Sequence, residues 1–125
     1  HYLERIVPEN EDSYQLQEDK KKITTGDSIY GAIGLAYHMG VKKILLLGVD
    51  VYGYGHWYDR NAPYNAYKQK EDKFDEYKAT VIKIYRQCVP QLKARGIDIL
   101  NGSEYSKIDA FEKDNLKNGL KWIRE

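Results

Sequence analysis

Three short segments of the chain carry residue types that commonly bind or transform small molecules. The first, Ile23 to Ser28, places Thr24, Thr25 and Gly26 directly before a predicted helix. Backbone N–H groups and hydroxyls at a helix start can hold a phosphate, and the helix dipole favours negative charge there. Thr25, Asp27 or Ser28 can equally serve as a simple helix cap. The residues alone leave both interpretations open.

The second segment ends in Asp50, which follows the aliphatic run Ile44 to Val49. A carboxylate directly after a buried strand can hold a ribose hydroxyl, a metal ion or a substrate amine. The alternative is a loop acid that accepts hydrogen bonds from nearby amides. We therefore treat Asp50 as a candidate ligand-binding residue.

The third segment, Tyr52 to Asp59, combines two glycines with aromatic residues around His56. The glycines permit a tight, exposed path, and the imidazole titrates near neutral pH. His56 is a candidate general acid or base, with Asp59 orienting it. The alternative is a structural histidine or a contact at the rim of a site.

Composition excludes several classes of function. Lysine and arginine number 20 against 19 acidic residues, so we expect no nucleic-acid partner. One cysteine and three histidines match no zinc-ligand spacing, so we predict no metal site of that kind. Lys22 ends a short basic cluster that is usually solvated but can also help to neutralise a phosphate.

The same composition bears on location. The sequence has no apolar run of about 18 residues and no signal-peptide pattern, so we expect no membrane span. The lone Cys88 cannot form an internal disulfide, which fits a reducing compartment. We therefore expect a cytoplasmic protein. The chain begins with His1 in what reads as the middle of a longer sequence, so we interpret it as a fragment.

Apolar spacing predicts the elements around these segments. Residues 28–39 form a helix that ends at Gly40, and its predicted buried face consists of Ile29, Ala32, Ile33, Ala36 and Met39. The run from Ile44 to Val49 lacks polar alternation, which is typical of a central parallel strand buried on both faces. The following stretch, residues 50–70, has no period and reads as a long loop.

Other segments complete the pattern. Residues 8–22 read as a loop, and residues 71–89 as a helix that Pro90 kinks. Its predicted apolar stripe consists of Phe74, Tyr77, Val81, Ile84, Tyr85 and Cys88. Residues 97–100 form a second short strand, and residues 114–123 a last helix.

Alternating helices and strands predict an α/β fold, a three-layer Rossmann-like parallel sheet. We expect one domain or fragment over residues 1–125, with 1–22 as a poorly ordered or connecting segment and 23–125 as the core. Ligands in such sheets bind beyond the carboxyl ends of the strands. The Thr24 to Gly26 turn and Asp50 should therefore meet in one crevice.

Residues 23–52 also match a pattern of T-x-G, an alanine-containing helix and G-x-x-x-I-x-L-x-G-x-D. This stretch resembles bacterial sialyltransferases that use CMP-activated sialic acid, and also the hydroxymethylpterin pyrophosphokinase-like family. The loop Gly55 to Asp59 is most similar to uncharacterised phage proteins. The resemblance implies that the chain is the C-terminal part of a larger sialyltransferase-like domain.

The sialyltransferase resemblance implies a transferase that binds a nucleotide sugar such as a CMP-sugar. Thr24, Thr25 and Gly26 match the segment that contacts phosphate and sugar. Asp50 and Tyr52 match positions that line the CMP pocket, and Lys22 stands where that family has an arginine.

Two alternatives remain open at this level. In a pterin-type pyrophosphokinase, Asp50 and Asp59 would hold Mg²⁺ against ATP phosphates. In a non-catalytic binding or assembly module, the tyrosine-rich loop would be an interface, including one between identical chains.

Overall fold

The computed structural model describes residues 2–49 and 78–125 of the chain. Its helices and strands, in chain order, are β1 (Glu4–Ile6), β2 (Lys22–Thr24), α1 (Ser28–Met39), β3 (Lys43–Leu46), α3 (Val89–Ala94), β4 (Asp98–Asn101), β5 (Glu112–Lys113) and α4 (Leu116–Arg124). Residues 78–86 are also helical.

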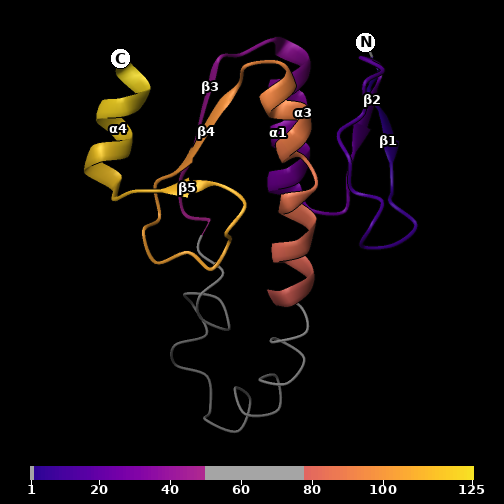
Figure 1. Ribbon diagram of the computed structural model, residues 1–125. Coiled ribbons are helices and arrows are strands. Elements are labelled where there is room, and N and C mark those ends of the chain that lie inside the picture. The colour runs from indigo at the N-terminus through magenta and orange to yellow at the C-terminus, as the bar shows by residue number, and fades with distance from the viewer. Residues whose placement is uncertain (1, 50–77) are drawn as a thin grey trace, which may run out of the picture.

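The described strands form two small sheets, and every pairing in them is parallel. One sheet has the order β1-β2 and the other the order β3-β4-β5. Figure 1 shows α1 and the helical stretch ending in α3 standing between the two sheets, with α4 on the far side of the three-stranded one. The α/β class predicted from the sequence is therefore confirmed.

The predicted strand from Ile44 to Val49 is parallel, but two of its expected features are wrong. It ends at Leu46, because Gly48 adopts a left-handed φ of 72° that a strand cannot continue through. Within the described sheet β4 is central and β3 lies at an edge. Ile44 and Leu45 are partly buried and Leu46 is buried, so both faces of β3 are at least partly covered, whereas Leu47 beyond its end is 53% exposed.

The helix over residues 28–39 has the predicted bounds and ends at Gly40, which has a φ of 72°. The predicted buried face is confirmed only in part: Ile33 is buried and Ala36 partly buried, but Ile29, Ala32 and Met39 are exposed. The other buried residues are Tyr30, Gly34 and Tyr37. The two tyrosine rings bury more apolar surface than the aliphatic stripe would.

The next helix breaks where proline was expected to disturb it. Residues 87–88 form a turn, and Pro90 occupies the first turn of α3, where its missing N–H leaves no helical hydrogen bond unmade. Of the predicted apolar stripe, Val81, Ile84, Tyr85 and Cys88 are buried. Phe74 and Tyr77 lie outside the described residues.

Residues 8–21 form neither helix nor strand, in agreement with the predicted loop, yet this loop is part of the packed structure. Leu16 is buried, and its N–H and C=O both bond to the Gln91 side chain. The Glu18 carboxylate accepts hydrogen bonds from Tyr37, Gln91 and Arg95. The loop is thereby fastened to both α1 and α3.

The C-terminal helix begins two residues later than predicted. Asn115 caps α4 by accepting a hydrogen bond from the Asn118 N–H at 2.8 Å. Gly119 faces the sheet, and a Cβ placed on it would lie 3.0 Å from Leu45 Cδ1. A glycine at this position lets α4 approach β3 closely.

Candidate functional site

The start of α1 is the candidate site that the described residues contain. Strand β2 ends at Thr24, and the turn Thr25-Gly26-Asp27 leads directly into α1. Gly26 has a φ of 109°, a conformation that side-chain-bearing residues rarely adopt. A Cβ at Gly26 would also lie 2.7 Å from Tyr14 Oη. The predicted glycine is therefore required for the shape of this strand–turn–helix unit.

Asp27 is the residue that caps α1. Its Oδ1 accepts a hydrogen bond from the Tyr30 N–H at 2.9 Å and a second from Tyr85 Oη at 2.8 Å. Capping by Asp27 was one of the alternatives that the sequence left open, and the structure confirms it. The second bond ties the turn to the helical residues 78–86.

The two threonines of the turn differ in what their hydroxyls contact. Thr24 is buried, donates to the Gln15 carbonyl at 2.7 Å and accepts from Gln17 Nε2 at 3.0 Å. Thr25 is half-buried, and its hydroxyl lies 3.4 Å from the Ile6 carbonyl, a long and weak contact. The Thr24 hydroxyl therefore holds the loop in place, whereas the Thr25 hydroxyl can turn to another acceptor.

Two backbone N–H groups at the start of α1 have no acceptor in the described part of the chain. Tyr30 and Gly31 donate to Asp27, but no hydrogen bond is formed by the N–H groups of Ser28 and Ile29, and both residues are exposed. Free amides at a helix N-terminus carry the positive end of the helix dipole. The sequence pattern had marked Ser28 only as a possible cap, and nothing in it distinguished these two amides.

Lys22 is the first residue of the three-residue strand β2. Its carbonyl oxygen is 2.6 Å from His38 Nε2, and His38 belongs to the last turn of α1. The Lys22 backbone is therefore in contact with a side chain from the C-terminal turn of the helix. Its assignment to a phosphate remains a prediction.

Asp50, Tyr52, His56 and Asp59 lie outside the described residues, so their predicted roles remain predictions. The chain immediately before Asp50 is well defined, because the buried side chain of Asn101 donates to the Val49 carbonyl at 3.1 Å. In Figure 1 the end of β3 and the first turn of α1 are the lower ends of these two elements. The sequence predicted a ligand crevice at these ends.

Asn101, the last residue of β4, is a positioning residue that is not among the predicted site residues. Its Oδ1 accepts the Ser103 N–H at 3.0 Å while its amide holds Val49, so one fully buried side chain joins the carboxyl ends of β3 and β4. The signal available in the sequence was an asparagine placed directly after the predicted strand 97–100.

Two further properties of the described residues bear on function. No helix among them is long and apolar enough to cross a membrane. Residues 2–49 and 78–125 contain no cluster of three or more histidine, cysteine or acidic side chains suited to a metal ion.

The comparisons with known proteins give no relative for this chain: no family model, no curated protein and no solved structure matches it.

Proposed function

We propose that the chain binds a nucleotide sugar and belongs to a sialyltransferase-like transferase. The observation that supports this most directly is the β2–turn–α1 unit, in which the left-handed Gly26 leads to the free N–H groups of Ser28 and Ile29. Together with the Thr25 hydroxyl, these groups form a set of donors for phosphate oxygens.

In this proposal the nucleotide phosphate lies at the start of α1, and Asp50 and Tyr52 contact the ribose or the base. The acceptor oxygen forms a bond to the anomeric carbon of the sugar while the bond from that carbon to the phosphate oxygen breaks. His56, oriented by Asp59, takes the proton of the acceptor hydroxyl. The amides at the helix start stabilise the charge left on the departing phosphate.

The proposed Rossmann-like fold can be tested separately from the ligand. It requires β2 and β3 to belong to one sheet, whereas here they belong to two. A crystal structure of the chain with bound CMP tests this point. If β2 and β3 remain in separate sheets around the nucleotide, the Rossmann-like assignment is wrong.

Calorimetric titration with CMP, a CMP-sugar and ATP with Mg²⁺ distinguishes the candidate functions. Preference for the CMP compounds supports the proposal, and strict dependence on ATP and Mg²⁺ supports a pyrophosphokinase. Absence of any nucleotide binding supports a non-catalytic binding or assembly module.

A matched pair of variants locates the phosphate. Thr25→Val should weaken CMP binding about tenfold to a hundredfold, the usual effect of losing one hydrogen bond to a charged group, and leave the unfolding temperature nearly unchanged. Thr24→Val should instead lower stability, because its hydroxyl joins Gln15 and Gln17. Unchanged CMP affinity in Thr25→Val would remove this hydroxyl from the site.

A further inference from the structure

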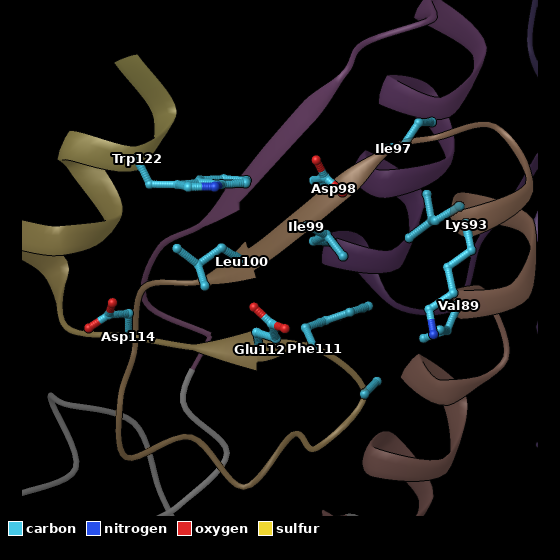
Figure 2. Close-up of a pocket in the computed structure, with 12 residues that line it drawn as sticks. Val89, Lys93, Ile97, Asp98, Ile99, Leu100, Phe111, Glu112, Asp114 and Trp122 are labelled. Atoms are coloured by element: carbon cyan, nitrogen blue, oxygen red, sulfur yellow. The ribbon is translucent and has the colours of Figure 1, made fainter. Parts of the chain in front are cut away.

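A hollow of about 440 Å³ runs along the free edge of β4, between α3 and α4 (Figure 2). It exists because β5 pairs with β4 only at Leu100 and Asn101. In the described part of the chain, Asp98 and Ile99 therefore have no neighbouring strand on this side. The volume is within the range of roughly 300–1,000 Å³ that is usual for small-molecule pockets.

The floor of this β4-edge pocket is apolar. Val89, Ile99 and Ala110 line it and are only partly buried, whereas Leu92, Ile97, Leu100 and Phe111, which also line it, are buried. A ligand that covers such a floor gains free energy by removing apolar surface from water. The occupant should therefore have an aliphatic or aromatic body.

The polar groups of the pocket are mainly acidic. Asp98, Glu112 and Asp114 line it, whereas Lys93 is the one basic residue among the lining side chains that the structure describes. Within the described residues, the carboxylates of Asp98 and Glu112 make neither a hydrogen bond nor an ion pair. Figure 2 shows Lys93 extending along α3 toward Val89, and not toward Asp98. The two free carboxylates are thus left to an external cation.

Trp122 lines the pocket on the side of α4, and its ring already contacts a cation of the chain itself. Lys43 Nζ lies 5.0 Å from the centroid of the Trp122 ring and donates to the Trp122 carbonyl at 3.0 Å. Indole attracts cations more strongly than the other aromatic side chains. Lys43 therefore already uses this attraction, so Trp122 adds apolar surface to the pocket, and the preference for a cation comes from the free carboxylates of Asp98 and Glu112.

We propose that the β4-edge pocket binds a small organic cation, an ammonium or guanidinium group carried on an apolar body. The cationic group pairs with Asp98 and Glu112, and the apolar body covers the partly exposed Val89, Ile99 and Ala110. This site is separate from the phosphate site at α1 and takes a ligand of opposite charge. Its test is therefore independent of the proposed nucleotide function.

The probe is 4-phenylbutylamine, with 4-phenylbutyrate as an analogue of similar size and opposite charge. Trp57→Phe leaves Trp122 as the single tryptophan of the chain, since the sequence has two. In this background, the amine should bind saturably in calorimetry and change the Trp122 emission. The carboxylate should bind at least about tenfold more weakly, because it meets unpaired carboxylates.

A pair of double variants with equal change in charge completes the test. Asp98→Asn with Glu112→Gln should weaken amine binding about tenfold while the thermal unfolding temperature stays nearly constant. Glu9→Gln with Glu104→Gln removes two exposed carboxylates elsewhere and should leave binding unchanged. Three outcomes would each overturn the proposal: no saturable amine binding, equal binding of the carboxylate, or equal losses in the two double variants.

Discussion

The two buried tyrosines of α1 provide a matched test of how this structure is stabilised. Tyr30 is fully buried, and its hydroxyl has no hydrogen-bond partner in the described part of the chain. Burial, together with the adjacent Cys88 thiol, raises the pKa of Tyr30. Tyr37 is also buried, but its hydroxyl donates to Glu18 Oε1 at 2.7 Å. Tyr30→Phe therefore removes a hydroxyl that makes no hydrogen bond in the described part of the chain, whereas Tyr37→Phe removes one that does.

The expected effects on the free energy of unfolding have opposite signs. An unpaired buried hydroxyl costs about 1–3 kcal/mol, so Tyr30→Phe should stabilise the protein by about 1 kcal/mol after a small loss of packing. Tyr37→Phe breaks a hydrogen bond to a carboxylate. Because Glu18 is 62% exposed, we expect only about 1 kcal/mol of destabilisation, near the lower end for charged partners.

Urea denaturation followed by circular dichroism measures both changes, and thermal unfolding should show midpoint shifts of about 3–5 °C in opposite directions. Both variants keep the aromatic ring, so the edge contacts of Tyr30 with Tyr14 and Tyr85 are retained. A loss of about 1 kcal/mol or more in Tyr30→Phe would refute the reasoning, since it would mean that the Tyr30 hydroxyl has a stabilising partner.

Three further perturbations follow from named contacts. Hydrogen bonds from Tyr37 and Gln91 lower the pKa of Glu18 below its ordinary 4.5, so this stabilisation is present above pH 4.5 and is lost as pH falls through the folded-state pKa. The difference in unfolding free energy between wild type and Glu18→Gln should shrink over that range, and a difference independent of pH would contradict the assignment. Burial raises the pKa of the Cys88 thiol to about 12. At pH 8 a disulfide reagent should therefore label Cys88 only when the protein unfolds, and the labelling rate should follow the unfolding rate as the urea concentration rises. Rapid labelling of the folded protein would contradict this. Gly26→Ala should destabilise by about 1–2 kcal/mol, because alanine at a φ of 109° is strained and its Cβ would meet Tyr14 Oη, and adding Tyr14→Phe should recover part of the loss in urea denaturation.

Local signals in the sequence predicted the helix bounds well. Gly40 ends α1, and Pro90 lies in the first turn of α3 after a break, since the backbone preferences of glycine and proline do not depend on distant contacts. The buried face of α1 was not predictable in the same way. Aliphatic and tyrosine residues share the helix without a charged residue between them, so both faces are apolar and the tertiary structure selects one.

No pattern in the sequence predicts the short strands at the N-terminus. β1 and β2 have three residues each, too few for a period-two pattern, and they form only because Glu4 to Ile6 pair with Lys22 to Thr24 across an irregular loop. Tyr14 is a similar case, since its contact with Gly26 comes from that loop. Such contacts depend on the path of the loop, which the aperiodic residues 8–21 do not reveal.

Asn101 holds the backbone directly before Asp50, a residue that we selected from the sequence. Asp50 was selected because it follows the β3 run, but a carboxylate can serve a ligand only if the backbone before it is fixed. The buried Asn101 amide fixes that backbone through the Val49 carbonyl, and Asn101 Oδ1 fixes the turn after β4 through the Ser103 N–H. An aspartate in place of Asn101 would lose the donor to Val49 and bring a buried charge next to its carbonyl oxygen. The carboxyl ends of β3 and β4 would then lose their common anchor, and any binding by Asp50 would weaken together with the stability of the sheet.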